Sequence, residues 1–362
     1  MPVWGAGPRA CMPRVIWRPI ARTPNAATRR PDGNSCSNCS DHCEKSFWQT
    51  QMIWGDKNVL AVGGGKGGVG KSSLAANLGV LLAQQGHAVV LVDADLGAAN
   101  LHTITGVTYP EKTLDDFIQG RQRSLEDTLL KTPHPGLRLL SSASDVLSIA
   151  APNYAQRQKL LRGIKNLDAD TVIFDLAAGT HTRAIDFFSL APYGIILVEP
   201  TPTSLENAYS FVKNLMLRHL MRVFYHEKET REFIKNATDP HRPGHAPHFS
   251  ELLTQLEARH PAKTEKVRQQ FTQAVHSVYL IVNSVRRPDQ FKAADRFVRI
   301  IKRYLTLNLR ILGALPYEPR MDDAIVARVP LVARHPDCGY ARGLRQIVTN
   351  LGIPPRASAS RA

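Results

Sequence analysis

A glycine-rich stretch at residues 59–73 combines the residue types that hold the phosphates of a nucleotide. It reads VLAVGGGKGGVGKSS, and from Gly65 onward it satisfies the pattern G-x-x-x-x-G-K-[ST]. In this pattern the glycines let successive backbone N–H groups point into one concavity, Lys71 reaches the β- and γ-phosphates, and the Ser72 hydroxyl binds Mg²⁺. The apolar spacing of residues 74–86 predicts a helix, whose N-terminus favours anions. The expected nucleotide-binding residues of this P-loop are Gly65, Lys66, Gly67, Gly68, Val69, Gly70, Lys71, Ser72 and Ser73.

A dinucleotide site is the alternative interpretation of the same glycines. Gly65, Gly67 and Gly70 also satisfy G-x-G-x-x-G, and the acids of LVDAD follow at about the distance where a dinucleotide fold places its ribose-binding acid. Such a fold has no use for Lys71 and Ser72 directly after the last glycine. The sequence therefore favours the P-loop.

Two apolar runs that end in acids predict where the rest of the site lies. Residues 87–95 read HAVVLVDAD and residues 170–179 read DTVIFDLAAG. Continuous apolar runs of this kind are typical of strands in a parallel sheet that is covered on both faces. Ligands bind at the carboxyl ends of such strands, where Asp93, Asp95 and Asp175 fall. Two acid-ended strands beside a Gly-Lys-Ser loop are a sharper signal than any one of these features.

A second lysine in the loop, Lys66, makes the pattern more specific. The segment GGGKGGVGKSS resembles the deviant phosphate loop of the MinD/ParA superfamily of P-loop ATPases, and the resemblance covers about residues 59–351. It implies an α/β fold with a doubly wound, mostly parallel sheet and helices on both faces. It also implies slow hydrolysis of Mg²⁺·ATP and an ATP-dependent homodimer in which Lys66 touches the partner's nucleotide. A solvated lysine in a flexible loop is the alternative interpretation of Lys66.

The resemblance also implies roles for the strand-end acids. Asp95 matches the residue that orients or deprotonates the attacking water, Asp93 lies near the Mg²⁺ shell, and Asp175 matches the carboxylate that holds a Mg²⁺-bound water. A helix cap is the alternative interpretation of Asp93. The implied catalytic residues are Lys66, Lys71 and Asp95, and the implied metal ligands are Ser72, Asp93 and Asp175.

Later segments of the chain match the family's adenine site and one of its branches. Asn283 matches the adenine-contacting position, and Pro316 and Tyr317 resemble the loop that packs on adenine. The segment 187–213 resembles the flagellar-number regulators, a branch that implies control of flagellar number or placement with a regulatory protein partner. Ser204 is also expected to cap the helix that follows it. The residues that carry this likeness are Pro202, Thr203, Ser204, Asn207, Ala208, Tyr209 and Lys213.

Two other functions remain open from the sequence. Cys36, Cys39 and Cys43, with His42 beside the last, have a spacing that suits zinc or an iron–sulfur cluster, and iron–sulfur carrier ATPases belong to the same superfamily. Unliganded thiols are the alternative. A DNA-partition ATPase is the other function, because the net charge of +15 is concentrated at the C-terminus, where residues 286–362 hold 15 Lys and Arg against 6 Asp and Glu.

Four of the basic residues of this region fall along one predicted helix. Residues 291–307 form an amphipathic pattern in which Lys292, Arg296, Arg299 and Arg303 align on one side. We expect this stripe to contact either an anionic membrane or DNA, and a solvated helix face is the alternative.

Composition and pattern predict the following organisation. Residues 1–58 form a disordered basic extension with the cysteine cluster, unless translation begins at Met12 or Met52. Residues 59–218 and 277–352 form the ATPase domain, residues 219–276 form a helical insertion with a polar loop, and residues 353–362 form a disordered tail. No apolar run approaches the ~20 residues needed to span a bilayer. We expect a cytoplasmic protein, or one peripheral on the inner membrane face.

Overall fold

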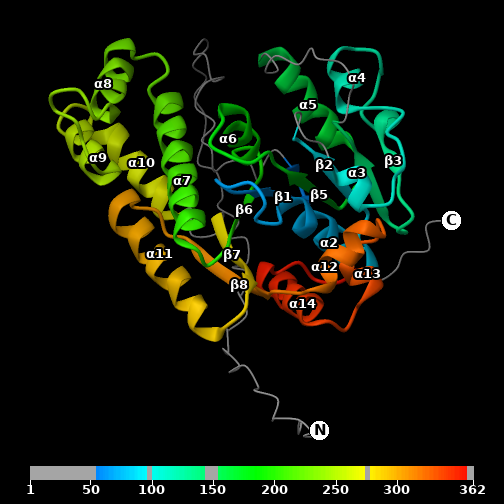
Figure 1. The fold of residues 1–362 in the computed structure, drawn as a ribbon. Helices are drawn as coiled ribbons and strands as arrows, with labels where there is room; N and C mark the ends of the chain where they lie inside the picture. Colours follow the sequence, from blue (N-terminus) through cyan, green and yellow to red (C-terminus); the bar gives the residue numbers. More distant parts are fainter. Residues whose placement is uncertain (1–53, 96–99, 143–153, 274–277, 357–362) are drawn as a thin grey trace, which may run out of the picture.

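A computed structural model describes residues 54–95, 100–142, 154–273 and 278–356. Its centre is one eight-stranded sheet with the order β3-β4-β2-β5-β1-β6-β7-β8 (Figure 1). All neighbouring strands pair in parallel except β3 and β4, which pair antiparallel. The predicted doubly wound, mostly parallel sheet is therefore confirmed. The strands are β1 (Asn58–Gly63), β2 (Val89–Asp93), β3 (Leu130–Lys131), β4 (Leu137–Leu140), β5 (Thr171–Asp175), β6 (Tyr193–Val198), β7 (Val278–Val285) and β8 (Arg310–Pro316).

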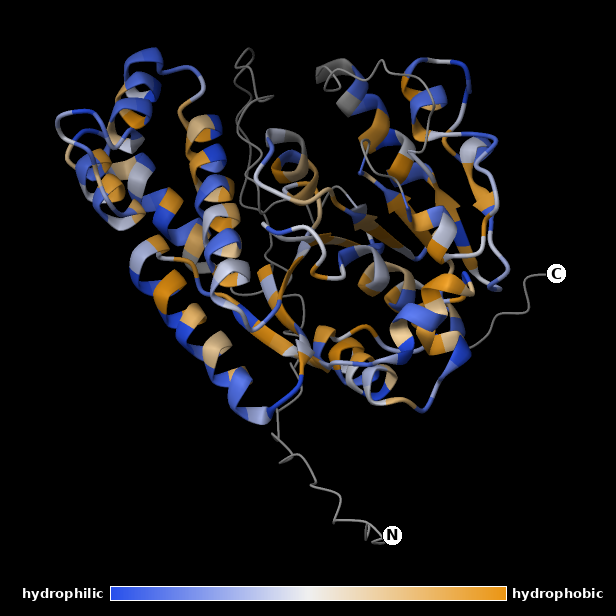
Figure 2. Ribbon diagram, viewed as in Figure 1, coloured by the Kyte–Doolittle hydropathy of each residue, from blue (hydrophilic) through white to orange (hydrophobic). Residues whose placement is uncertain are grey.

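Both faces of this sheet are buried, which explains why its strands are continuously apolar. In β5, Val172 and Phe174 belong to one hydrophobic core and Ile173 belongs to the other. The strands are accordingly coloured as predominantly hydrophobic in Figure 2, whereas polar residues lie on the outer sides of the helices. A strand with only one buried face would alternate apolar and polar residues instead.

The helices divide between the two faces. One face is covered by α2 (Lys71–Gln84), α3 (Leu101–Ile104), α12 (Arg320–Val326), α13 (Leu331–Arg334) and α14 (Gly339–Leu351). The other face is covered by α4 (Leu114–Ile118), α5 (Tyr154–Asn166), α6 (Thr182–Phe188), α7 (Pro202–Val223) and α11 (Phe291–Leu305). Among the described residues, the 3₁₀ turns η1 (Glu126–Thr128) and η3 (Pro288–Gln290) lie between these helices and strands.

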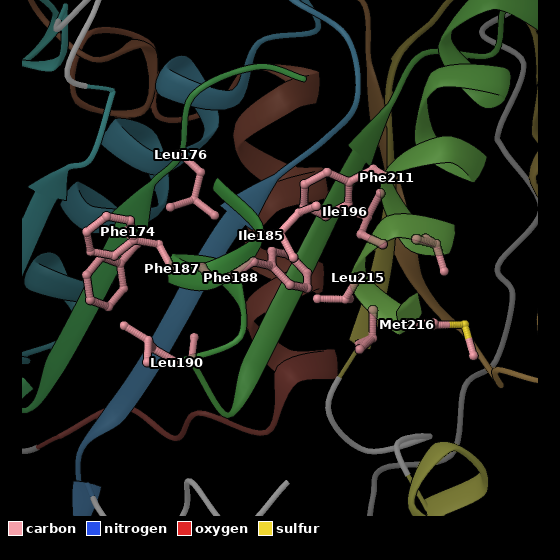
Figure 3. Close-up of a cluster of buried hydrophobic side chains, with 14 of the residues drawn as sticks. Phe174, Leu176, Ile185, Phe187, Phe188, Leu190, Ile196, Phe211, Leu215 and Met216 are labelled. Carbon is pink, nitrogen blue, oxygen red and sulfur yellow. The ribbon is translucent and has the colours of Figure 1, made fainter. Parts of the chain in front are cut away.

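A cluster of aromatic side chains lies between the sheet and helices α6 and α7 and packs against the end of β1 (Figure 3). The rings of Phe188 and Phe211 meet edge to face with centroids 5.2 Å apart. Phe188 lies so close to the sheet that a Cβ on Gly194 would come within 2.4 Å of its ring, and a Cβ on Gly63 within 2.9 Å. The strands at the centre of the sheet therefore need glycine at the two positions that the ring of Phe188 covers.

The chain between β6 and β7 adds a group of helices beside α7, namely α8 (Lys228–Thr238), α9 (Phe249–Glu257) and α10 (Pro261–Gln273). Figure 1 shows them gathered at the end of α7 and next to α11. The buried rings of Phe249 and Phe271 meet edge to face at 5.7 Å and join α9 to α10. Because α7 continues to Val223, residue 219 lies inside a helix, and α8–α10 extend the same core.

The prediction that Ser204 caps α7 was wrong. The N-cap is Thr201, whose hydroxyl accepts a hydrogen bond from the Ser204 N–H at 3.4 Å. Pro202 follows the cap and suits the first helical position, because its φ is already helical and it has no N–H to satisfy. Ser204 instead accepts a hydrogen bond from the Glu199 N–H at 3.0 Å, so it ties the strand end to the helix.

Some expectations concern residues outside the described ones. Cys36, His42, Cys39 and Cys43 lie there, as do the extension up to residue 53 and the tail from residue 357. Within the described residues, no three His, Cys, Asp or Glu side chains are placed to hold a metal ion. Among those same residues, no helix combines the length and apolarity that crossing a bilayer requires.

Candidate functional site

The order of the central strands brings the sequence-predicted residues together. The strand β5 lies between β1 and β2, and Asp175 pairs in register with Val62 on one side and Asp93 on the other. The P-loop begins where β1 ends and leads into α2. Consequently Lys71, Ser72, Asp93 and Asp175 converge at the carboxyl edge of the sheet, although they come from segments far apart in the chain.

The P-loop is held so tightly that glycine is required at specific positions. A Cβ on Gly65 would lie 1.9 Å from the Asn207 carbonyl oxygen of α7, and a Cβ on Gly64 would lie 2.9 Å from the Leu197 carbonyl oxygen of β6. Gly70 has a φ of 91°, in the left-handed region, and its Cβ would lie 2.7 Å from Asn283 Nδ2. The loop therefore follows the end of β6 and the first turns of α7 at van der Waals contact.

Asp175 is the most unusual group in the site. Its carboxylate is buried, and Oδ1 has no hydrogen-bond partner. Burial raises the pKa of Asp175 to about 7, although a hydrogen bond from Ser72 and the charge of Lys71 lower it. A buried carboxylate oxygen without a partner is costly in a folded protein. Beside the Ser72 hydroxyl it offers the oxygen ligands that Mg²⁺ prefers, so these residues fit that ion.

Asp93 lies next to Asp175 and is equally buried. Burial and the charge of Asp175 raise the pKa of Asp93 to about 8. Its two oxygens accept hydrogen bonds from the backbone N–H groups of Asp95 and Leu101, each at 3.2 Å. Leu101 is the first residue of α3, so the Asp93 carboxylate already binds a helix N-terminus. The geometry is compatible with the capping interpretation and leaves Asp93 beside the Mg²⁺-compatible pair of Asp175 and Ser72.

The two lysines of the P-loop lie in different environments. Lys71 is buried and donates a hydrogen bond to the Lys66 carbonyl oxygen at 3.2 Å. Burial lowers the pKa of Lys71, while the charges of Asp175 and Asp95 raise it. Lys66 points to the other side, where its Nζ lies 3.6 Å from Oε2 of Glu199 in a partly exposed ion pair. Glu199 directly follows β6 and was not singled out from the sequence.

The expected adenine residues lie at the ends of β7 and β8. Asn283 donates a hydrogen bond to the Val69 carbonyl oxygen at 2.8 Å, which joins it to the P-loop. It precedes Ser284, whose φ of 57° marks a β-bulge that changes the direction of the end of β7. Tyr317 is 42% exposed, and the Arg286 guanidinium lies 3.5 Å from its ring centroid. Arg286 was not singled out from the sequence, because its stacking depends on the pairing of β7 with β8.

A parallel sheet whose first strand ends in a glycine-lysine-serine loop, beside two acid-ended strands, defines a P-loop nucleotide-binding fold. The profile of the "CobQ/CobB/MinD/ParA nucleotide binding domain" family matches residues 60–331. The chain belongs to this family. Its predicted membership of the MinD/ParA superfamily is thereby confirmed.

Individual relatives agree with this assignment. The antiactivator FleN of Pseudomonas aeruginosa is 38% identical over 168 residues, which cover 46% of this chain and 59% of FleN. The flagellum site-determining protein YlxH of Helicobacter pylori is 29% identical over 176 residues, covering 47% of this chain and 56% of YlxH. These alignments thus span little more than half the length of either relative.

Among solved structures, the MinC:MinD cell division protein complex of Aquifex aeolicus contains a similar chain. The TM-score is 0.54 at 22% identity, and the match covers 83% of this chain and 99% of that one. At this identity the likeness concerns the fold.

Proposed function

We propose that this protein binds Mg²⁺·ATP at the carboxyl edge of its sheet, hydrolyses it slowly, and uses the cycle to switch between monomer and homodimer. The observation that carries the proposal is the buried Asp175 carboxylate, which keeps one oxygen without a partner beside Lys71 and Ser72. Burying this acid costs stability, and a site that binds a cation with the nucleotide gives a reason for it. Membership of a nucleotide-binding family supports the same function.

Different residues of the site bind the phosphates, the Mg²⁺ and the adenine. The backbone N–H groups from Gly65 to Ser73 bind phosphate oxygens, and Lys71 adds its charge to them. Ser72 and Asp175 hold the Mg²⁺, and Asp93 completes the acidic surroundings. The ion supplies charge neutralisation at the β- and γ-phosphates. Asn283, Pro316 and Tyr317 contact the adenine at the ends of β7 and β8.

Hydrolysis and dimerisation use the remaining two charged residues. Asp95 orients or deprotonates the water that attacks the γ-phosphate, because it follows β2 at the same sheet edge. Lys66 cannot duplicate Lys71, since it points away from Asp175 toward Glu199. Its charge is therefore assigned to the nucleotide of the partner subunit, where it stabilises a dimer that exists with ATP.

The names of the relatives support a role for this protein in the control of flagellar number or placement. In this role it would act with a regulatory protein partner. One relative is called an antiactivator and another determines the site of flagella. FleN is 38% identical to this chain over the 168 matched residues.

The outer face of α11 supplies a surface for an anionic partner. Lys292, Arg296, Arg299 and Arg303 are exposed along this 15-residue helix, and Ile300 among them is 44% exposed. Ala294, Phe297, Ile301 and Leu305 of this helix are buried against the core, so the cations lie on its outer side. We assign this face to a membrane or DNA.

Reversing the charges of Arg299 and Arg303 should weaken ATP-dependent binding to anionic vesicles or duplex DNA and flatten its salt dependence. A wild-type protein that binds neither at low salt excludes this role.

The nucleotide site is tested by isothermal titration calorimetry with Mg²⁺·ATP. Lys71→Ala should abolish measurable binding, because it removes the cation that contacts the phosphates. Lys112→Ala, at an exposed position outside the site, is the matched control and should bind like the wild type. Thermal unfolding of both variants verifies that they fold. Unchanged affinity in a folded Lys71→Ala protein would refute the P-loop function.

A further inference from the structure

We infer that Glu199 is a positioning residue that holds Lys66 within its own protomer and thereby sets how readily the ATP-bound dimer forms. The inference rests on the dimerisation switch proposed above and adds a residue to it. Glu199 is the first residue after β6, which lies directly beside β1 in the sheet. The topology therefore brings the acid and the lysine, each just after a strand end, to adjacent positions.

The P-loop is fixed against the segment that carries Glu199. Gly64 and Gly65 lie against the Leu197 and Asn207 carbonyl oxygens so closely that neither position has room for a Cβ. The backbone just before Lys66 consequently cannot move away from β6 and α7 without opening these contacts. The lysine is thus presented to the end of β6 in the nucleotide-free protein.

The backbone of Glu199 is held in place by two hydrogen bonds. Its N–H donates to the Ser204 hydroxyl at 3.0 Å, and its carbonyl accepts from the Thr201 N–H at 2.8 Å. The flanking residues Pro200 and Pro202 restrict the backbone further. When the carboxylate on such a turn forms an ion pair, only side-chain entropy is lost, because the backbone is already ordered.

The ion pair between Lys66 and Glu199 is weak enough to be broken by a competing anion. The Nζ to Oε2 distance is 3.6 Å, and the two side chains are 37% and 25% exposed. An ion pair of this exposure contributes little, so a triphosphate with its higher charge can displace the carboxylate. In the proposed dimer both protomers must release Lys66 from Glu199, and the cost of two broken pairs opposes assembly. Glu199 therefore raises the protein concentration at which the ATP-bound dimer forms.

The test is the dissociation constant of the dimer, measured by sedimentation velocity with Mg²⁺ and a non-hydrolysable ATP analogue. Glu199→Gln keeps the size of the side chain and both backbone hydrogen bonds but removes the charge. It should tighten the dimer by about 3- to 30-fold, as expected for two partly exposed pairs. The difference from the wild type should shrink in 0.5 M salt, since partly exposed charges are screened. Glu206→Gln removes the same charge from an exposed position on α7 and should leave the constant unchanged.

A second measurement reports the pair itself in the nucleotide-free protein. The rate of Lys66 acetylation by a small reagent, followed by mass spectrometry, should rise several-fold in Glu199→Gln, while Lys213 on α7 serves as the internal reference. An unchanged Lys66 rate, or a dimer that Glu199→Gln leaves equal or weaker, overturns the role of Glu199. A wild type that remains monomeric with the analogue at every concentration, despite binding it, overturns the dimerisation switch on which this role rests.

Discussion

The carboxyl edge of the sheet and the group of helices α7–α10 both hold buried or partly buried titratable side chains, but in different surroundings. At the sheet edge, Asp175 is buried with an oxygen that has no partner, next to the equally buried Asp93. In the helical group, the buried His219 is paired with Gln270 at 2.9 Å, and His260 is hydrogen bonded to Thr230 at 2.8 Å. At the sheet edge two acids are buried side by side, whereas among the helices each of these two rings has a hydrogen-bond partner.

The difference separates groups kept for function from groups kept for structure. Buried acids in contact with one another lower stability, so they persist only where a ligand or a reaction needs them. A neutral histidine with a satisfied hydrogen bond costs little and helps specify one packing of the helices. The predictions below test whether the two regions differ in this way.

The largest effect is expected at the sheet edge, in the rate of ATP hydrolysis. Asp95→Ala should lower turnover by ~10²–10⁴-fold while ATP still binds, because Asp95 acts on the attacking water alone. Steady-state phosphate release and calorimetry measure the two quantities. Asp239→Ala, at a partly exposed position after α8 and outside the site, is the control and should retain full turnover. A turnover within threefold of the wild type in Asp95→Ala would remove this acid from the site.

The second effect concerns the helical group and depends on pH. Burial, together with the charge of Arg222, lowers the pKa of His219 to about 4, compared with 6.5 for an ordinary histidine, although His219 donates a hydrogen bond to Gln270 Oε1 that raises it. The unfolded chain therefore takes up a proton between pH 6.5 and 4 that the folded protein does not, so stability is complete above pH 6.5 and is lost as the pH falls. Between pH 7.5 and 5.0, His219 should account for a loss of about 2 kcal/mol in the free energy of unfolding.

Urea unfolding at the two pH values measures this loss. His219→Gln should flatten the pH dependence even if it lowers the stability at both values, since the slope reports proton uptake. His241→Gln changes an exposed histidine and should leave the slope as it is in the wild type. Equal slopes in His219→Gln and the wild type would contradict the structural role of this ring.

The third prediction again concerns the sheet edge. Most core substitutions lower the free energy of unfolding, but this one should raise it. Asp175→Asn should raise the free energy of unfolding of the nucleotide-free protein by about 1–2 kcal/mol, because it neutralises a buried carboxylate that faces another. The same change should abolish the dependence of ATP affinity on Mg²⁺. Asp127→Asn, an exposed position before β3, controls for surface charge. A destabilised Asp175→Asn protein would mean that the acid is structural after all.

The smallest effect is expected at an ion pair among the helices. Glu227 pairs with Lys263 and lies 3.6 Å from His260, but all three side chains are partly exposed. Glu227→Gln should therefore change the free energy of unfolding by less than about 1 kcal/mol, and less still in high salt. Chemical denaturation at two salt concentrations measures it. A loss above 2 kcal/mol would show that this pair holds the helices together.

Local patterns in the sequence were sufficient to predict much of the fold. The continuous apolar run of β5 is required wherever a strand is covered on both faces, so it identifies a parallel sheet from composition alone. The amphipathic spacing of α14 and the left-handed Gly352 that ends it are local features of the same kind, because both depend on neighbours within a few residues. The start of α7 was misjudged by three residues, since Thr201 and Ser204 both resemble caps and Pro202 decides between them.

The residue types of the site were determined by the sequence, and their mutual geometry by the tertiary structure. Glycines followed by Lys71 and Ser72 predict phosphate binding wherever they occur, because the backbone and side-chain chemistry is local. No local pattern states that β5 lies between β1 and β2, so the register of Asp175 with Asp93 and the contact of Asn283 with the P-loop emerge only when the strands are ordered. The pair of Lys66 with Glu199 is of the same kind. Periodicity determines which face of a strand is buried, whereas long-range packing decides which strand ends become neighbours.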